Sequence, residues 1–204
     1  MDMFLKRIFD LVCSSMLLIV FSPLLLLISA VVWVSSGRPI FFRQERAGFR
    51  RLIFKIIKFR TMSFGEVSGK GALITASLDK RVTKLGRILR KYKLDELPQL
   101  FNVFLGNMSL VGPRPEVPKF VDMYPDEVRD QVLSVRPGIT DIASIEFFNE
   151  EKLLLAGENV EKMYAESILP AKLNLAVKYV KTRNMSMDIK LLLKTMLKMV
   201  GYYQ

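Results

Sequence analysis

Residues 11–34 read LVCSSMLLIVFSPLLLLISAVVWV, and the rest of the architecture is built around this run. The run holds no charged residue. As a helix, its about 24 residues would extend for about 36 Å, which is enough to cross a bilayer. It is longer than the apolar core of a signal peptide, and no small-residue cleavage site follows at a suitable distance. The sequence therefore predicts a membrane helix near the N-terminus.

Ser22 and Pro23 lie near the middle of this run. Pro23 has no amide hydrogen and its ring collides with the carbonyl of Ile19, so the helix should kink or break there. The Ser22 hydroxyl can hydrogen-bond to a carbonyl that the proline leaves without a donor. We therefore expect an interruption in the middle of the membrane helix.

Basic residues flank the apolar run on both sides. Lys6 and Arg7 precede it, and the larger group that follows consists of Arg38, Arg43, Arg46, Arg50 and Arg51. Because Lys and Arg concentrate in cytoplasmic segments, the C-terminal bulk is expected in the cytoplasm, and the N-terminal pair favours the same side. A re-entrant helix that turns at Ser22-Pro23 satisfies both ends, whereas a kinked spanning helix places the first residues outside. The charge pattern leaves both topologies open.

Composition narrows the chemistry of this 204-residue chain. The formal net charge of +11 predicts an anionic partner: phosphate groups, an acidic membrane surface or nucleic acid. There is no histidine, which excludes Ser-His and Cys-His nucleophiles and histidine metal sites. The one cysteine, Cys13, lies inside the apolar run, so neither an internal disulfide nor a zinc cluster can form. Carboxylates, hydroxyls, amines and guanidiniums must carry any chemistry.

The remaining residues predict a mainly helical α+β fold. Apolar runs at 40–42 and 52–59, separated by Glu45-Arg46-Ala47-Gly48, predict a small β-hairpin beside the membrane. Residues 80–93 have the apolar spacing of a helix. A second helix is expected to begin near Pro98, a residue suited to a first turn.

Glycine and proline mark three further segments. Residues 65–71 superficially suggest a phosphate-binding P-loop, but the spacing is one residue short and Gly71 replaces the hydroxyl residue, so we interpret them as a flexible loop. Residues 112–115, Gly-Pro-Arg-Pro, should be extended and stiff. Residues 136–138, Arg-Pro-Gly, are typical of a turn.

The last third of the chain is expected to be helical. Lys190, Lys194 and Lys198 recur every four residues and stack on one face of a helix, with apolar residues on the other. A basic amphipathic helix of this kind suits a membrane surface. Ordinary core packing explains the pattern equally well, so both interpretations stay open.

Asp95 and Glu96 form the most informative polar pair, because seven basic residues spread over 80–93 precede them without an acid. Adjacent carboxylates repel each other, and one use of such a pair is to share a divalent cation. The pair precedes the helix expected at Pro98, whose N-terminus attracts anions. Considered alone, the two acids are better explained as a helix cap.

Basic side chains elsewhere can join this pair. Lys58 and Arg60 end the predicted hairpin, and Arg90 precedes the pair by five residues. Arg114 is held between two prolines, which limits the freedom of its backbone. Guanidinium groups bind phosphate oxygens in pairs. Cations around a carboxylate pair, on a membrane-tethered chain without histidine, indicate phosphoryl chemistry.

In order and spacing these motifs resemble the bacterial sugar transferase family, the monotopic phosphoglycosyl transferases. The resemblance covers roughly residues 4–140 and lies in Lys6-Arg7 with Phe9-Asp10, Ser22-Pro23, Pro39–Gly48, Lys58–Met62, Leu94–Val103, Met108–Pro115 and Arg136–Thr140. After Thr140 the chain departs from the family pattern. No sugar-contacting residue is therefore carried over, and the sequence selects no particular sugar.

The resemblance implies a topology and a location. Residues 1–36 would form a re-entrant membrane helix-break-helix, interrupted at Ser22-Pro23. Residues 37–204 would form a catalytic domain with amphipathic helices at the membrane surface. This domain would lie on the cytoplasmic face of the bacterial inner membrane.

The resemblance also implies an activity. Asp95 would attack the UDP-sugar phosphate that adjoins the sugar, expel UMP and carry the phosphosugar until undecaprenyl phosphate accepts it. Glu96 would help Asp95 to hold Mg²⁺ or handle the acceptor's proton. The cations expected to bind substrate phosphates are Arg114, Arg90, Lys58, Arg60 and Arg136. The reaction would be the first membrane step of bacterial glycoconjugate synthesis, and a homodimer or a complex with downstream glycosyltransferases is left open.

A competing hypothesis is a non-catalytic basic module, anchored to the membrane, that binds anionic lipid, a protein partner or nucleic acid. It explains the positive charge but gives no role to Asp95-Glu96 or to Arg114 between its prolines. No recognised nucleic-acid-binding motif accompanies the charge, so we expect no nucleic-acid partner.

Overall fold

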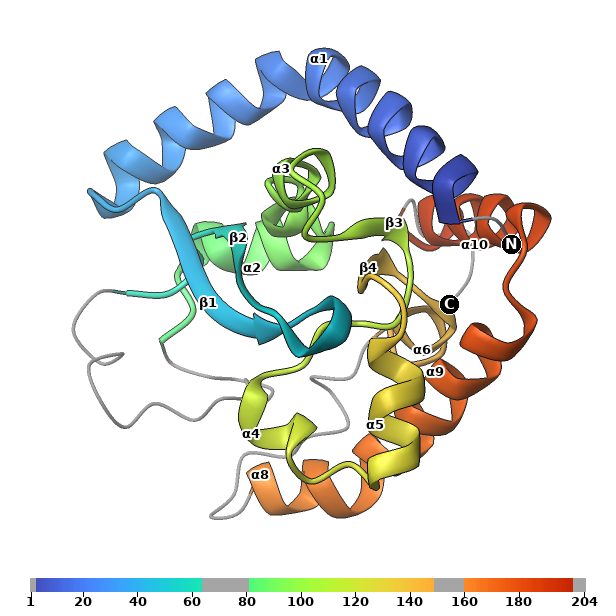
Figure 1. The fold of residues 1–204 in the computed structure, drawn as a ribbon. Coiled ribbons are helices and arrows are strands. Elements are labelled where there is room, and N and C mark those ends of the chain that lie inside the picture. The colour runs from blue at the N-terminus through green and yellow to red at the C-terminus, as the bar shows by residue number, and fades with distance from the viewer. Residues whose placement is uncertain (1–2, 64–80, 149–159, 200–204) are drawn as a thin grey trace.

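The computed structural model describes residues 3–63, 81–148 and 160–199 (Figure 1). Helices dominate these residues, and two small sheets accompany them, so the expected mainly helical α+β class is confirmed. The segment at 65–71, which we interpret as a loop, lies outside the described residues.

The N-terminal helix α1, Met3–Ser36, arches over the rest of the chain (Figure 1). It is continuous through Pro23, so the expected interruption is a bend in one helix and not a break. The Ser22 Oγ donates a hydrogen bond to the Ile19 carbonyl at 2.8 Å. Ile19 is the residue whose carbonyl Pro23 leaves without an amide donor, which confirms the predicted use of the hydroxyl.

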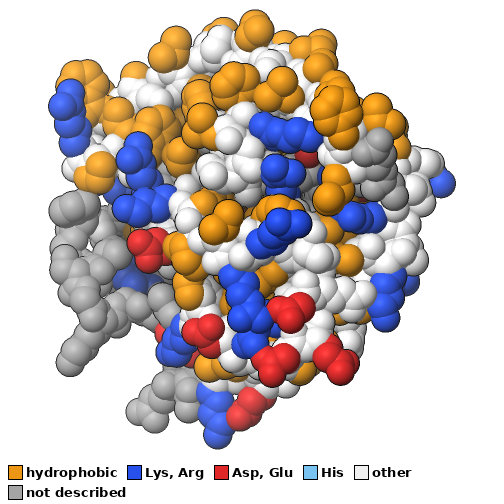
Figure 2. All heavy atoms as spheres, in the orientation of Figure 1, with side chains coloured by type: hydrophobic (Ala, Val, Ile, Leu, Met, Phe, Trp, Pro, Cys, Tyr) orange, Lys and Arg blue, Asp and Glu red, His pale blue; other side chains and the backbone are white. Residues whose placement is uncertain are grey.

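One side of α1 packs against the rest of the protein, and the apolar residues on its other side are exposed. Along its C-terminal half, Leu25 and Val32 are buried in a cluster with Phe59. On the outer side, Ile19 is 74% exposed and Leu26 72% exposed. Figure 2 shows hydrophobic side chains gathered along the edge that α1 forms. Among the described helices α1 alone is long and apolar enough to cross a membrane, which indicates membrane association.

A buried polar network fixes the N-terminal half of α1 to two other helices, α9 (Leu169–Thr182) and α10 (Met185–Met199). The Lys6 Nζ lies 2.7 Å from the Asp188 Oδ2 and 3.7 Å from the Asp10 Oδ1. The Tyr179 hydroxyl donates to the other oxygen of Asp188 at 2.8 Å. Burying one ammonium with two carboxylates is tolerated because every charge has a partner.

The predicted hairpin consists of β1, Phe41–Ala47, and β2, Ile53–Phe59, paired antiparallel with Phe41 opposite Phe59. Its turn lies later than expected, because β1 continues through the Glu45–Ala47 segment that we assigned to the turn. The turn falls at Arg50 and Arg51, which adopt positive φ angles of 52° and 64°. Arginine rarely adopts this conformation, so the local pattern carried no turn signal there.

The two helices expected around the carboxylate pair are confirmed as α2, Lys84–Lys91, and α3, Gln99–Phe104. Thr83 caps α2 by accepting a hydrogen bond from the Gly86 amide at 2.9 Å. A Cβ on Gly86 would lie 2.1 Å from the Thr61 carbonyl oxygen, so only glycine lets α2 approach the end of the hairpin this closely.

The second sheet is parallel and was not predicted. It pairs β3, Ser109–Val111, with β4, Gly138–Thr140. The Arg136-Pro137-Gly138 motif, which we expected to form a turn, instead leads directly into β4. A Cβ on Gly138 would lie 2.1 Å from the Gly112 amide nitrogen. The glycine is therefore required by close backbone approach and not by turn geometry.

The remaining helices surround these sheets (Figure 1). They are α4 Pro118–Val121, α5 Asp126–Leu133, α6 Ile142–Glu146 and α8 Val160–Met163, with a π-helical turn at Tyr164–Ile168 between α8 and α9. On α10 the buried Leu191 faces the core, whereas Leu193 and Met196 are exposed. The Lys198 Nζ donates to the Ile145 carbonyl at 2.7 Å, so this lysine caps α6 and does not share the exposed setting of Lys190 and Lys194.

Candidate active site

Asp95 and Glu96 lie in a tight turn between α2 and α3. Lys93, two residues after the end of α2, has a left-handed conformation with φ of 54°, and Leu94–Glu96 then form one turn of 3₁₀ helix. This turn directs both carboxylates inward, and Asp95 is only 7% exposed. The expected position just before α3 is thus confirmed, but neither acid is a simple exposed helix cap.

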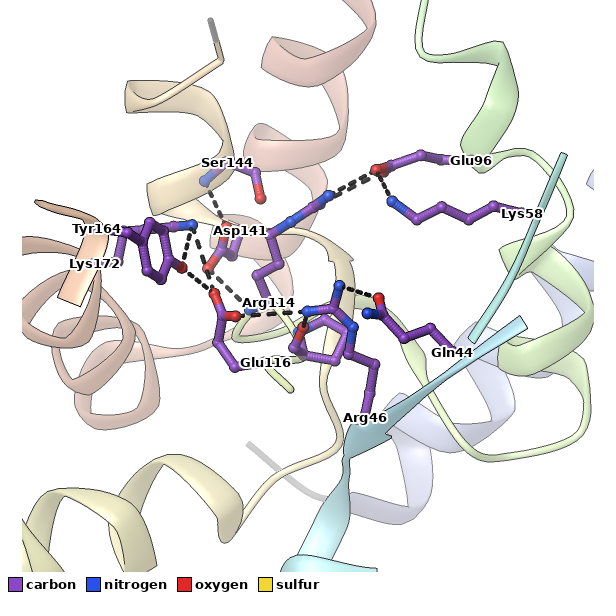
Figure 3. A network of polar contacts seen from close by, with 11 residues as sticks. Gln44, Arg46, Lys58, Glu96, Arg114, Glu116, Asp141, Ser144, Tyr164 and Lys172 are labelled. Carbon is purple, nitrogen blue, oxygen red and sulfur yellow. Dashed lines mark hydrogen bonds and ion pairs between the residues drawn. The ribbon is translucent and has the colours of Figure 1, made fainter. Parts of the chain in front are cut away.

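Glu96 binds two cations that come from distant segments (Figure 3). Its Oε1 lies 2.7 Å from the Lys58 Nζ on β2 and 2.6 Å from an Arg114 guanidinium nitrogen. Burial by itself would raise the pKa of Glu96, but the charges of Arg114 and Lys58 hold that pKa well below its usual range. Glu96 is therefore an ionised anchor for both cations.

Asp95, unlike Glu96, forms no ion pair within the described part of the chain. Its Oδ1 is buried and accepts no hydrogen bond from the part of the chain that the structure describes. Burial raises the pKa of Asp95, and the neighbouring Glu96 raises it further, against the opposing charges of Lys58 and Arg90. One carboxylate oxygen thus lies desolvated and unengaged beside several cations. An oxygen without a hydrogen-bond partner keeps its lone pairs available, which is compatible with a carboxylate nucleophile.

The predicted phosphate-binding cations fall into two groups. Lys58 and Arg114 converge on Glu96, and Arg90 lies close enough to lower the pKa of Asp95, while its Nε donates to the Thr61 hydroxyl at 2.9 Å. Arg60 instead donates to the carbonyls that end α1, including that of Gly37 at 2.7 Å.

Arg136 lies apart from the carboxylate pair. Its Nε donates to the Gly106 carbonyl at 2.9 Å, and its guanidinium carbon lies 5.5 Å from the centre of the Phe49 ring. Among the contacts of the described residues, neither Arg60 nor Arg136 reaches Asp95 or Glu96. Their assignment to substrate phosphates stays a prediction.

The backbone of the segment that carries Arg114 is hydrogen-bonded by residues that were not predicted from the sequence (Figure 3). Asp141 accepts the Arg114 backbone amide at 3.2 Å and caps α6 through the Ser144 amide at 2.6 Å. Arg46 donates to the Pro115 carbonyl at 3.1 Å. Both ends of the short segment are therefore restrained, which limits the positions that the Arg114 guanidinium can take.

Glu116 extends this support to α9. It pairs with Arg46 at 3.5 Å and with Lys172 at 3.6 Å, and it accepts a hydrogen bond from the Tyr164 hydroxyl. Tyr164 and Lys172 carried no signal in the sequence, because they lie in a plain helical stretch outside every motif. Glu116 could have been suspected from its place directly after Arg114-Pro115.

The carboxylate pair offers two oxygen-bearing side chains that could bind a metal ion. Within the described residues, no three His, Cys, Asp or Glu side chains gather to form a metal cage. Magnesium is commonly held by one or two carboxylates together with substrate phosphates. The unengaged Asp95 Oδ1 beside Glu96 fits this mode of binding, in which phosphate oxygens complete the coordination.

Together, the apolar helix and the carboxylate pair among cations define a class: a membrane-associated α+β protein suited to phosphate-containing substrates. Comparison with known families identifies the family within this class. The chain belongs to the bacterial sugar transferase family, whose pattern it matches over residues 1–202. The resemblance seen in the motifs is thereby confirmed, and it extends beyond Thr140.

Individual relatives carry more specific names. The UDP-glucose:undecaprenyl-phosphate glucose-1-phosphate transferase of Klebsiella pneumoniae is 37% identical over 97% of this chain and 40% of its own length. The protein of the same name from Caulobacter vibrioides is 36% identical over 93% of this chain and 67% of its own length. An undecaprenyl-phosphate galactose phosphotransferase of Salmonella typhimurium is 39% identical over 72% of this chain and 33% of its own length. The chain thus spans less than half the length of two of these relatives.

Proposed function

We propose that this chain transfers a sugar-1-phosphate from a UDP-sugar to undecaprenyl phosphate, with Asp95 as the nucleophile. The observation that carries the proposal is the buried Asp95 Oδ1, which has no hydrogen-bond partner among residues 3–63, 81–148 and 160–199, while Glu96 beside it pairs with Lys58 and Arg114. The names of relatives that match nearly the whole chain support the same donor and acceptor.

The proposed reaction has two displacements at one phosphorus. First, an Asp95 oxygen attacks the phosphorus that adjoins the sugar, the bond from that phosphorus to the bridging oxygen breaks, and UMP leaves with the electron pair. The product is a phosphosugar linked to Asp95. An oxygen of undecaprenyl phosphate then attacks the same phosphorus, which restores the Asp95 carboxylate and gives a polyprenyl diphosphate sugar.

The neighbouring residues assist by position and charge. Arg114 and Lys58 neutralise the substrate phosphates, and Glu96 holds both cations in place. Arg90 adds positive charge close enough to Asp95 to lower its pKa. Asp95 and Glu96 would also hold Mg²⁺, which when bound would neutralise the diphosphate and make UMP a better leaving group.

The proposal includes a re-entrant α1 and a catalytic body on the cytoplasmic face of the inner membrane. Both ends of α1 contact that body: Lys6 pairs with Asp188 at one end, and Arg60 binds the Gly37 carbonyl at the other. A straight spanning helix would carry one end across the bilayer, away from these partners. The exposed apolar residues of α3 and α10, including Phe104 and Leu193, would then lie at the membrane surface.

Purified protein supplied with a panel of UDP-sugars, Mg²⁺ and undecaprenyl phosphate tests the proposal. We expect UMP release with at least one sugar, reduced on the order of 10³-fold or more in Asp95→Asn. Without the acceptor, wild-type protein should release one equivalent of UMP, and its intact mass should increase by one phosphosugar. Full UMP release by Asp95→Asn would remove this residue from the mechanism.

A further inference from the structure

Gln99 is a buried polar residue that the reaction described above does not use. It opens α3 and is 1% exposed, yet its Nε2 has no hydrogen-bond partner among the described residues. A buried amide that makes no hydrogen bond is destabilising, and native proteins retain few of them. The position of Gln99 therefore points to a binding role.

The backbone brings Gln99 toward the two acids. Leu97 and Pro98 both have right-handed helical angles, so the chain turns continuously from the Asp95 turn into α3. Gln99 follows Glu96 by three residues and Asp95 by four, which is one helical turn. Side chains on a helix lean toward its N-terminus. From this spacing we expect the Gln99 amide to be directed toward the turn that holds both carboxylates.

The residues one turn before and one turn after Gln99 both contact β2. One turn further along α3, the Asn102 side chain accepts the Ile57 amide at 3.0 Å and donates to the Lys55 carbonyl at 2.9 Å. One turn earlier, Glu96 binds Lys58. Gln99 lies between these contacts on the buried face of α3, so the same face carries Asn102, Gln99 and the acids in succession.

The turn before α3 and the start of α3 thus hold a buried donor and a buried acceptor, Gln99 Nε2 and Asp95 Oδ1, for which the described part of the chain supplies no hydrogen-bond partner. We propose that Gln99 is a substrate-binding residue whose Nε2 donates a hydrogen bond to a non-bridging oxygen of the phosphate that Asp95 attacks. This inference rests on the proposed function. A neutral amide suits the role because, unlike a lysine, it stabilises charge on the phosphate without pairing permanently with Asp95.

Gln99→Met tests the inference, because methionine has a similar volume and no donor. UMP release from UDP-sugar without acceptor isolates the first displacement, and thermal unfolding is followed in parallel. We expect the rate of this UMP burst to fall by about 10- to 100-fold. The melting temperature should stay the same or rise, because an unpaired buried polar group has been removed.

Two further variants sharpen the test. Gln99→Glu introduces a negative charge facing the phosphate and should slow the burst more than Gln99→Met does. Gln131→Met, the same substitution on α5 outside the site, should leave both the burst and the melting temperature unchanged.

A wild-type burst rate in Gln99→Met would overturn the inference. A lowered melting temperature in that variant would also overturn it, because it would assign Gln99 to the fold, satisfied by a buried water. These outcomes are distinct from failure of the proposed function, which would appear as no UMP release by the wild-type protein with any UDP-sugar.

Discussion

At the residue scale, the two adjacent acids differ in which side chains surround them. Glu96 pairs with Lys58 and Arg114, whereas the Oδ1 of Asp95 is buried and has no hydrogen-bond partner among the described residues. Because of this difference, the pKa of Glu96 is lowered well below its usual range while that of Asp95 is raised. The two carboxylates should therefore contribute to stability with opposite signs.

Asp95→Asn should leave the melting temperature at pH 7 unchanged or raise it. Because the folded-state pKa of Asp95 is raised, the folded protein binds this proton more readily than the unfolded chain, and stability falls as pH rises through that pKa. The asparagine removes this cost. A drop of several degrees in thermal unfolding would show that ionised Asp95 is stabilised by the fold, contrary to this account.

Glu96→Gln should destabilise the protein by about 3 kcal/mol at pH 7, because Lys58 and Arg114 lose their shared anion. Since the folded-state pKa of Glu96 is lowered, its contribution is present above the unfolded pKa and is lost as pH falls through the folded value. The gap between wild type and variant should therefore narrow in acid. Glu127→Gln, at an exposed position on α5, serves as the control and should change little.

At the scale of elements, helices and the hairpin followed from local pattern, whereas the parallel pairing of β3 with β4 did not. Each of these strands is three residues long, too short for a recognisable alternation. Their pairing depends on Gly112 and Gly138, whose backbones touch only after the chain has folded. The turn at Arg50 and Arg51 was missed for a related reason, since tertiary packing outweighs the usual turn preferences there.

The attachment of α1 is a property of the helix as a unit, and Lys6→Met tests it. The variant leaves Asp10 and Asp188 without their shared cation, so the free energy of unfolding should fall by about 3 kcal/mol. Thermal or denaturant unfolding in detergent measures the loss. Lys190→Met, on the exposed face of α10, is the matched control. Equal stability of both variants would mean that the buried network does not hold α1.

At the scale of the whole molecule, the bent α1 brings membrane-facing and polar surfaces together. Hydrophobic side chains line the α1 edge in Figure 2, and basic side chains lie on the surface beside it. The candidate site is assembled from three segments: the turn before α3 supplies both carboxylates, β2 supplies Lys58, and the segment after β3 supplies Arg114. A substrate with a lipid tail and a phosphate head matches such a surface.

The same arrangement makes a prediction about topology. Reporters fused at Met1 and at Gln204 should both be active in the cytoplasm, because each end of α1 is tied to the body by buried polar contacts. Reporter pairs that function only in the cytoplasm or only outside it provide the measurement. An N-terminal reporter active outside the cytoplasm would establish a spanning helix and exclude the re-entrant form.

The sequence by itself determined the membrane helix, the hairpin, the helices on either side of Asp95-Glu96, and the family. These features depend on short-range pattern: apolar runs, helical periodicity, and proline or glycine at set positions. Only the tertiary structure decided that Lys58 and Arg114 bind Glu96, whereas the Asp95 Oδ1 meets no hydrogen-bond donor in the described part of the chain. Lys58 and Glu96 are 38 residues apart in the chain. Which of two adjacent carboxylates meets a cation depends on the direction in which the folded backbone points each side chain, and local pattern does not contain that information.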